Sequence, residues 1–377
     1  MKTIGIIAEY NPFHRGHEAQ LGLLRRRFGE DCALVIALGG CFTQRGEAAL
    51  FTKYARAEAA VRCGADLVLE LPVPWSVSSA EGFARGGVGV LDALGSADTL
   101  AFGSECADPE RLETIAALTA SPDYDALLRK ALSRGVGFAA ARQEALEALA
   151  GEALPELKSR NDILAVEYLR ALRAQGSAMA PLPLPRFAGY PPASALREKA
   201  DFLSELPEAA AAVFRREKAL GRQAEPERLD AAILARLRSM TDGELAALPG
   251  AAEGLQNRLK KAALAAGSVE ELLRLAVTKR YPAARLRRMA LAALLGVTAG
   301  MEKGLPPCLR VLGLNARGAK LLHDAAPGKP VITKPADGRG EIFELEARAC
   351  GIYALAFPEA SQRRGDLDYL STPFVLK

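Results

Sequence analysis

Residues 4–17 constrain the fold of this chain more than any other stretch, because a strand, a tight turn and a helix follow one another there without a gap. The apolar run at residues 4–8 predicts a buried strand. Residues 11–12, Asn-Pro, mark a turn, and apolar residues then recur at helical spacing over residues 21–28. A strand that leads directly into a helix is the repeating unit of a parallel α/β sheet.

Two of the chain's three histidines, His14 and His17, lie at the end of this turn. The first turn of a helix offers free backbone N–H groups and the positive end of the helix dipole, so it commonly forms a phosphate-binding site. The three-residue spacing lets both imidazoles face the same side of the helix, and Gly16 lets a ligand approach the backbone closely. Two such donors would stabilise the charge that develops as pyrophosphate leaves a nucleotide.

A plainer interpretation is that both histidines are ordinary turn and cap residues. The strand before them and the helix after them favour the functional interpretation. The glycine patterns of a dinucleotide-binding fold and of a P-loop are both missing from this stretch. The stretch therefore looks like the H-x-G-H site of the nucleotidyltransferase superfamily.

Further strands are expected at residues 33–38, 66–71 and 99–102, and helices alternate with them. This alternation predicts βαβ units and a parallel sheet. Glycine-rich turns follow the strands, and ligands bind at the carboxyl ends of parallel strands, so these turns predict a pocket. Cys41 lies in the turn after the second strand, where its thiol either lines that pocket or packs against the core.

Residues 109–172 have a helical pattern. Ser159 and Asp162 have the spacing of a capping box, which makes Asn161 an ordinary first-turn residue on the sequence alone. The prolines of residues 178–186 allow at most an edge strand. Ser194 is expected to cap a further helix, and together with Arg197 it suits either a second phosphate seat or a plain capped helix.

Beyond residue 200 the chain is mainly amphipathic helix, so we place a domain boundary there, between residues 1–200 and residues 201–377. One segment, residues 257–288, is strongly basic, with nine Lys or Arg against Glu270 and Glu271. Such a segment is either a solvated face or a binding surface for nucleic acid. The members that we select as RNA contacts are Arg258, Lys260, Lys261, Lys279, Arg280, Arg285, Arg287 and Arg288.

Composition narrows the class of protein. The net charge is only +4, so any basic surface must be local. The six cysteines are scattered without a Cys-x-x-Cys pair, which argues against a metal site and a disulfide framework and favours a reducing, cytoplasmic location. The longest mildly apolar run, residues 289–300, is too short to span a membrane.

Seven stretches together make the sequence resemble one family closely, the bacterial tRNA(Met) cytidine acetate ligases. The likeness runs over nearly the whole chain, and the stretch from Glu9 to His17 is far more specific than a bare H-x-G-H pattern. The similar stretches are residues 8–17, 42–47, 64–72, 102–105, 161–164, 253–258 and 279–281.

The resemblance implies a Rossmann-like nucleotidyltransferase domain with an ATP site, followed by a mainly helical region that binds tRNA. It implies His14 and His17 as catalytic residues. It also implies that Asn161 and Arg186 bind the nucleotide, a role that the sequence alone does not favour for them. The implied ATP-binding residues are Ile7, Ala8, Glu9, Tyr10, Asn11, Pro12, Phe13, His14, Arg15, Gly16, His17, Glu18, Ala19, Gln20, Gly103, Asn161 and Arg186.

The implied reaction joins acetate and ATP into acetyl-adenylate, with release of pyrophosphate. The N4 amine of the wobble cytidine of elongator tRNA(Met) then attacks the acyl carbon. ATP is thus a co-substrate, Mg²⁺ is left open, and no metal site is expected in the protein itself. Two alternatives remain, an adenylyltransferase that makes a nucleotide cofactor and a non-catalytic RNA-binding protein on the same fold.

Overall fold

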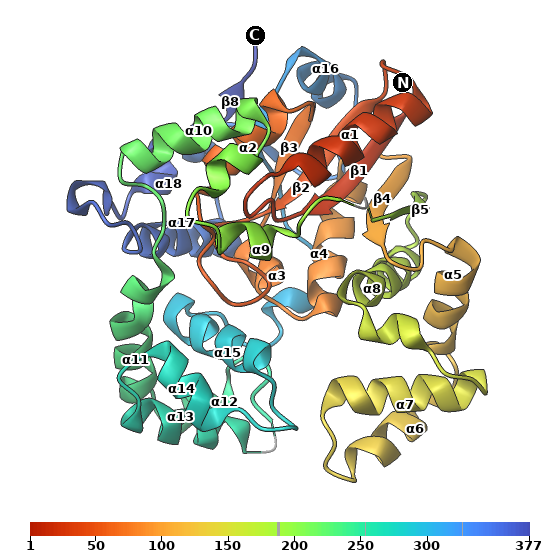
Figure 1. Cartoon of the computed structure of the whole chain (residues 1–377), viewed down its shortest axis with the longest axis vertical. Coiled ribbons are helices and arrows are strands. Elements are labelled where there is room, and N and C mark those ends of the chain that lie inside the picture. Colours follow the sequence, from red (N-terminus) through yellow and green to blue (C-terminus); the bar gives the residue numbers. More distant parts are fainter. Residues whose placement is uncertain (187–188, 253, 326) are drawn as a thin grey trace.

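An eight-stranded sheet forms the centre of the computed structural model, which describes residues 1–186, 189–252, 254–325 and 327–377 (Figure 1). Glu253, at the start of the family-like stretch 253–258, lies outside these ranges. The strand order is β5-β4-β1-β2-β3-β6-β7, with β8 paired to β6. The strands are β1 (Thr3–Ala8), β2 (Ala33–Gly39), β3 (Leu67–Leu71), β4 (Thr99–Ser104), β5 (Ala180–Pro185), β6 (Leu309–Leu314), β7 (Val331–Ile332) and β8 (Phe374–Val375).

The strands β1 to β5 pair with one another in parallel, which confirms the α/β fold class. Every residue of β2 is buried, as expected for a strand covered on both faces. Val35 and Ala37 pack toward α4 (Ala80–Ala93) and α8 (Arg160–Gln175). Leu34, Ile36 and Leu38 pack toward the opposite layer, which contains α1 (Arg15–Phe28), α2 (Lys53–Arg62) and α10 (Glu208–Ala219). The helices of the first half are α1 (Arg15–Phe28), α2 (Lys53–Arg62), α3 (Val73–Ser76), α4 (Ala80–Ala93), α5 (Pro109–Leu118), α6 (Tyr124–Leu132), α7 (Phe138–Ala150), α8 (Arg160–Gln175) and α9 (Ala193–Arg197).

Close packing explains why a glycine-rich segment is helical in α4. Glycine costs about 1 kcal/mol relative to alanine inside a helix. A Cβ atom on Gly87 would lie 2.6 Å from Cδ1 of Ile7 on β1. The glycine therefore lets α4 lie directly on the sheet, and burial of its apolar face compensates for the weak helix propensity.

The proline-rich strand β5 lies at the edge of the sheet, as the sequence predicted. Among the strands of the described residues it pairs only with β4, over the register Thr99 with Ala180 to Ser104 with Pro185. An edge position suits it because proline has no N–H to donate to a second neighbour. This strand carries Arg186, the residue that follows its last proline, to the carboxyl edge of the sheet.

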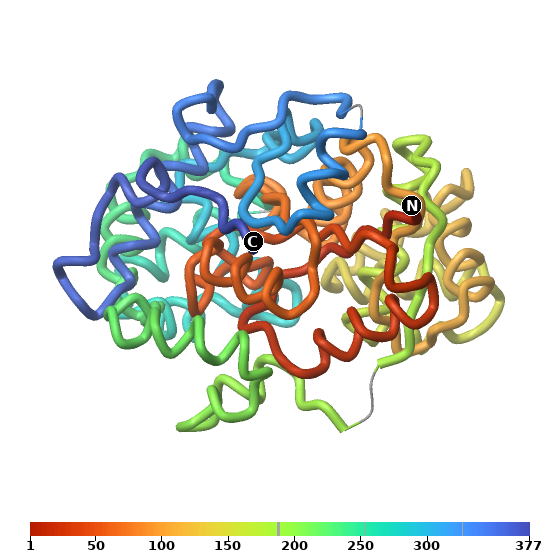
Figure 2. Tube along the Cα trace, turned by 90° about the horizontal axis from the view of Figure 1, so that it is seen from above, coloured from red at the N-terminus to blue at the C-terminus, as the bar shows by residue number. Residues whose placement is uncertain are grey.

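The second half of the chain is mainly helical, but it also completes the sheet. Strand β6 pairs antiparallel with β3, so residues after 300 close the edge that β3 would otherwise leave open. Figure 2 shows these blue C-terminal segments lying against the orange segment that contains β3. The helices are α10 (Glu208–Ala219), α11 (Asp230–Ser239), α12 (Asp242–Ala246), α13 (Leu255–Ala265), α14 (Val269–Ala276), α15 (Ala283–Leu295), α16 (Ala316–Asp324), α17 (Glu341–Ala354) and α18 (Leu367–Leu370).

Helices α11 to α15 form a helical body below the sheet in Figure 1, with a core that continues into α17. Phe42, from the loop after β2, and Val73, the first residue of α3, are part of the same core. The helical body is therefore packed onto the first region of the chain. The boundary near residue 200 stays a prediction. In the described part of the chain, no helix is long and apolar enough to cross a membrane.

A buried group of charges ties the early and late parts of the chain together. The Lys53 ammonium of α2 lies 2.5 Å from Glu70 of β3, 3.1 Å from Glu346 of α17 and 2.7 Å from Asp368 of α18. Arg310 of β6 also pairs with Asp368. All of these side chains are at most 5% exposed. Burial and repulsion by Glu70 raise the pKa of the Glu346 carboxyl to about 8.

Candidate active site

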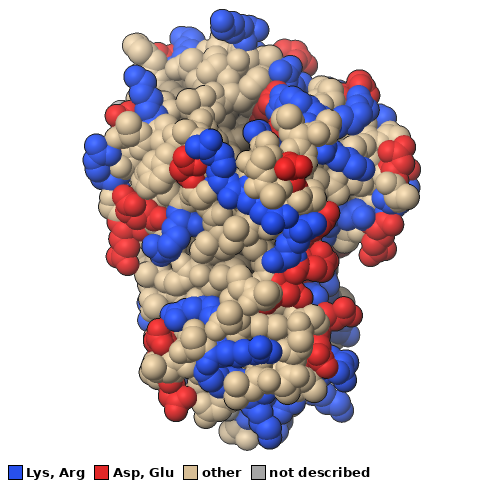
Figure 3. Space-filling model, turned by 90° about the vertical axis from the view of Figure 1, so that its left-hand side faces the viewer, with Lys and Arg blue, Asp and Glu red and all other residues tan. Residues whose placement is uncertain are grey.

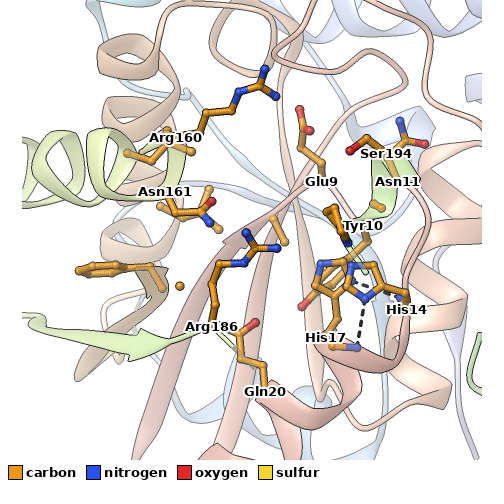
Figure 4. Close-up of a pocket in the computed structure, with 18 of the residues that line it drawn as sticks. Glu9, Tyr10, Asn11, His14, His17, Gln20, Arg160, Asn161, Arg186 and Ser194 are labelled. Carbon is orange, nitrogen blue, oxygen red and sulfur yellow. Dashed lines mark hydrogen bonds between the residues drawn. The ribbon is translucent and has the colours of Figure 1, made fainter. Parts of the chain in front are cut away.

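A cavity of about 630 Å³ opens at the carboxyl edge of the parallel strands. Its walls come from the end of β1 and the start of α1, the loop after β2, the ends of β4 and β5, the start of α8, and α9. This is where the glycine-rich turns predicted a pocket, because the carboxyl ends of parallel strands meet at one edge. Figure 4 shows the side chains that surround the cavity.

The two histidines are fixed by backbone hydrogen bonds at the start of α1. His14 is the N-cap residue, and its Nδ1 accepts from the Gly16 N–H at 3.0 Å. His17 Nδ1 accepts from the His14 N–H at 3.2 Å, so the two imidazoles form a reciprocal capping box. The rings are stacked with centroids 3.8 Å apart. Because both Nδ1 atoms are acceptors, the neutral rings carry their protons on Nε2, and these N–H groups remain to donate to a ligand.

The surroundings keep both imidazoles neutral. Burial, together with the positive charge of Arg186, lowers the pKa of His14 to about 4. Burial and the neighbouring His14 hold the pKa of His17 well below its usual range. At neutral pH the pair therefore acts as hydrogen-bond donors, and the charge for binding phosphate must come from other residues.

Arginines supply that charge. Four of them line the cavity, Arg45, Arg160, Arg186 and Arg197. Of these four arginines, Arg186 was predicted to bind ATP, and Arg197 was predicted either to form a second phosphate site with Ser194 or to belong to a plain capped helix. Arg197 also braces the histidine turn, since its Nη1 donates to the Asn11 carbonyl at 2.6 Å. The signal that could have identified Arg45 is its place in the family-like stretch 42–47.

Glu105 holds two of the predicted nucleotide-binding residues in place. Its Oε1 accepts from Asn161 Nδ2 at 2.8 Å and lies 3.5 Å from Arg186 Nη1. Its Oε2 accepts from the Ser159 hydroxyl. Glu105 therefore joins the turn after β4 to the start of α8 and the end of β5, a role that the sequence analysis missed.

Asp162, in the first turn of α8, also positions the turn after β4. Its carboxylate accepts from the Glu105 N–H at 2.9 Å, the Cys106 N–H at 3.2 Å and the Ser104 hydroxyl. The predicted cap of α8 is also present, because Ser159 Oγ accepts from the Asp162 N–H at 3.3 Å. The spacing of a capping box thus predicted where the helix begins. It did not predict that the Asp162 carboxylate also binds the turn after β4.

Most of the predicted ATP-binding residues line the cavity. Those that do are Ile7, Ala8, Glu9, Tyr10, Asn11, His14, Gly16, His17, Gln20, Gly103, Asn161 and Arg186. The other five, Pro12, Phe13, Arg15, Glu18 and Ala19, lie outside the lining. Pro12 and Phe13 are buried in the turn, and Arg15 and Glu18 point into solvent. These residues shape the turn or lie on the outer face of α1.

Two expectations for neighbouring residues need correction or refinement. Ser194 does not cap α9, because the N-cap position is Pro192 and Ser194 lies inside this five-residue helix. Ser194 nevertheless lines the cavity, as does Arg197. Cys41 is fully buried, with its Sγ 3.7 Å from Sγ of Cys350, so it packs in the core rather than lining the cavity.

Several residues of the predicted RNA-binding segment have partners within the protein. Arg258 donates to the carbonyls of Ala276 and Leu275 at the end of α14. Lys260 donates to three carbonyls at the end of α11. Such contacts satisfy helix C-termini, so these two cations have a structural task.

Helix α15 lies directly against the wall of the cavity. Arg287 pairs with Glu47 at 2.5 Å, and Arg288 donates to the Gln44 carbonyl at 3.3 Å. A Cβ atom on Gly46 would lie 2.6 Å from the Arg288 nitrogen, so only glycine allows this approach. Arg285 donates to the Gly250 carbonyl at 2.8 Å and lies near the ring of Tyr281, as does Arg280. Lys261 and Lys279 are exposed.

Comparisons with known proteins identify the family. A sequence profile described as HIGH Nucleotidyl Transferase matches residues 1–368. The chain is 33% identical to the tRNA(Met) cytidine acetate ligase of Syntrophomonas wolfei, over 99% of each chain. The chain belongs to the tRNA(Met) cytidine acetate ligase family. The ligase of Caldanaerobacter subterraneus is 34% identical over 95% of this chain and 96% of its own length.

Solved structures of the family share the fold over the full length. The crystal structure of Thermotoga maritima TmcAL bound with alpha-thio ATP superposes with a TM-score of 0.92 at 31% identity, and 100% of each chain is covered. The same enzyme without ligand gives a TM-score of 0.91 at 29% identity. The resemblance of this chain to the tRNA(Met) cytidine acetate ligases is thus confirmed by sequence and by fold.

Proposed function

We propose that this chain is an ATP-dependent ligase that acetylates N4 of the wobble cytidine in elongator tRNA(Met). The observation that supports this most directly is the pair of neutral imidazoles at the start of α1, whose Nε2–H groups make no hydrogen bond to any residue that the structure describes. Donors of this kind stabilise a departing pyrophosphate without a proton transfer. The full-length similarity to proteins named tRNA(Met) cytidine acetate ligase supports this choice of substrates.

In the first step an oxygen of acetate attacks the α-phosphorus of ATP, and pyrophosphate leaves. His14 and His17 donate to the phosphate oxygens, while Arg186 contributes positive charge from the end of β5. Glu105 fixes Asn161 and Arg186 for nucleotide binding. In the second step the N4 amine attacks the acetyl carbon of acetyl-adenylate, and AMP leaves.

Acetate-dependent exchange of labelled pyrophosphate into ATP tests the first step. His17→Ala should slow this exchange by about 10²–10³-fold, the usual cost of one charge-stabilising donor. His14→Ala should act similarly. The proposal is refuted if wild-type protein neither exchanges pyrophosphate, with or without tRNA, nor acetylates tRNA. A double variant with full exchange would remove the histidines from the mechanism.

ATP is the co-substrate in this proposal, and Mg²⁺ enters only as a companion of its phosphates. The described residues contain no cluster of three or more His, Cys, Asp or Glu side chains that could hold a metal ion. Repeating the exchange assay in excess EDTA measures the requirement. A cytoplasmic location, where ATP and tRNA are found, completes the proposal.

For tRNA binding we propose a surface that begins at Lys261 and Lys279 on the helical body and leads to the cavity along α15. Figure 3 shows basic side chains at the lower end of one face, where the helical body lies, and a further group of them across its middle, with acidic side chains interspersed in both parts. The turn that contains Lys279 also meets the start of α7, because a Cβ atom on Gly137 would lie 3.0 Å from the Lys279 carbonyl oxygen. Because Arg288 of α15 contacts Gln44 in the cavity wall, the RNA surface would lie beside the active site.

Salt dependence tests this surface. Each phosphate contact that is lost should reduce the slope of log affinity against log salt by about 0.7–0.9. We expect Lys279→Ala with Arg280→Ala to weaken tRNA binding and to leave acetate-dependent exchange intact. Normal affinity with an unchanged slope would show that the basic segment is a solvated surface, and the RNA site would have to lie elsewhere.

A further inference from the structure

The acceptor amine of the second step needs a group that can take its proton. The cavity has only two carboxylates among its described lining residues, Glu9 and Glu105. Glu105 is occupied by Ser159, Asn161 and Arg186. Glu9 follows the last residue of β1, and Figure 4 shows its carboxylate pointing away from His14 and His17.

The two carboxylate oxygens of Glu9 have different environments. Its Oε1 accepts from the Gln44 N–H at 2.6 Å. Its backbone carbonyl accepts from Arg56, a fully buried arginine that also donates to the carbonyls of Gly40 and Phe51. Within the described residues, Oε2 of Glu9 has no hydrogen bond and no ion pair. One oxygen therefore anchors the side chain, and the other faces the cavity.

The charges around Glu9 come from each element packed against it. Burial raises the pKa of the carboxyl, whereas the Gln44 N–H and the guanidinium groups of Arg56, Arg45 and Arg197 act to lower it. The net effect is an upward shift, which makes the carboxylate a better proton acceptor near neutral pH than an exposed glutamate.

We propose that Glu9 accepts a hydrogen bond from cytidine N4 and takes its proton as the acetyl group is transferred. Carboxylates are the usual acceptors for the N4 amine of cytosine. The N4–acetyl bond forms, the bond from the acetyl carbon to the phosphate oxygen breaks, and AMP takes the electron pair. One N4 proton moves to Oε2 of Glu9 and then to solvent. This inference rests on the proposed function.

Glu9→Gln tests the inference, because glutamine keeps an oxygen for the Gln44 N–H but cannot take a proton. Synthetic acetyl-adenylate and a tRNA(Met) transcript isolate the transfer step under single-turnover conditions. We expect transfer to fall by about 10²-fold or more, the usual contribution of a general base. Because Glu9 also lines the ATP cavity, acetate-dependent pyrophosphate exchange should fall by a much smaller factor than transfer, and tRNA affinity should stay near the wild-type value. The wild-type transfer rate should rise with pH to a plateau, and the variant should lack that rise.

Glu9→Asp is the second variant, and it should recover part of the transfer rate together with its pH dependence. Glu30→Gln, on the exposed loop after α1, is the matched control and should leave both steps unchanged. Equal loss of exchange and transfer in Glu9→Gln would overturn the inference, because Glu9 would then serve ATP or its metal ion. An undiminished transfer rate would also overturn it. Wild-type protein inactive in both assays would instead refute the proposed function.

Discussion

Lys260 and Lys261 are neighbours in the basic segment, but their side chains have different environments. The Lys260 ammonium donates to the carbonyls of Leu237, Arg238 and Met240 at 3.0, 2.7 and 2.8 Å. An ammonium has three protons, so all of them are used at the end of α11. Lys261 points into solvent from the next position of α13. The pair therefore separates a structural cation from a candidate RNA contact.

The expected stability change follows from these bonds. A hydrogen bond that involves a charged group contributes about 1.5–3 kcal/mol. The freed carbonyls lie at a helix end and regain water, so Lys260→Met should reduce the free energy of unfolding by about 2–4 kcal/mol rather than by the full sum. Lys261→Met should change it by less than about 0.5 kcal/mol, as surface substitutions usually do.

Two measurements on the same pair of variants check this division. Urea unfolding gives the stability difference, provided that the slope with denaturant is unchanged. Titration with a tRNA(Met) transcript at several salt concentrations gives the slope of binding. Lys261→Met should reduce that slope by about 0.7–0.9, and Lys260→Met should leave it unchanged. The reasoning fails if Lys260→Met is as stable as wild type, or if Lys260→Met alone reduces the slope.

Three further outcomes are expected. Alkylation of Cys41, followed by mass spectrometry, should be slow and indifferent to ATP, because the thiol is buried against Cys350; protection by ATP would place it in the cavity instead. The free energy of unfolding should fall as pH drops from about 6.5 toward 4, because the unfolded chain protonates His14 and the folded chain, with a pKa of about 4 there, does not; His14→Gln should lose less stability over this range. Lys53→Met should reduce the free energy of unfolding by about 3–5 kcal/mol in urea titrations, since Glu346 and its neighbours lose their cation; a cost below about 1 kcal/mol, the range of surface ion pairs, would contradict this.

The sequence predicted what depends on local pattern. Alternating strands and helices gave the sheet, and the H-x-G-H turn gave the location of the cavity. The orientation of the imidazoles was also expected, since three-residue spacing puts His14 and His17 on one side of the helix. The hydrogen bonds that reserve Nε2 for a ligand could not be predicted, because they depend on the backbone angles of the turn.

The features that the sequence did not predict depend on contacts between residues far apart in the chain. Lys260 is one of several cations in a basic run, and no local pattern shows that the end of α11, more than twenty residues earlier, needs its protons. The roles of Glu105 and Asp162 depend on the contact between the end of β4 and the start of α8, which no local sequence pattern reveals. The return of β6 to the sheet was likewise hidden, because six apolar or basic residues do not show which strand edge they will cover.

The position of Lys53 bears on how this chain folds while it is being made. A ribosome adds about 5–20 residues per second, so the 293 residues that separate Lys53 from Glu346 take about 15–60 s to synthesise. During that time Lys53 lacks two of its three carboxylate partners, and β3 lacks the strand that covers its edge. The nascent nucleotide-binding half therefore emerges with an unfinished core and an open strand edge, a form that chaperones recognise and that favours aggregation when they are scarce.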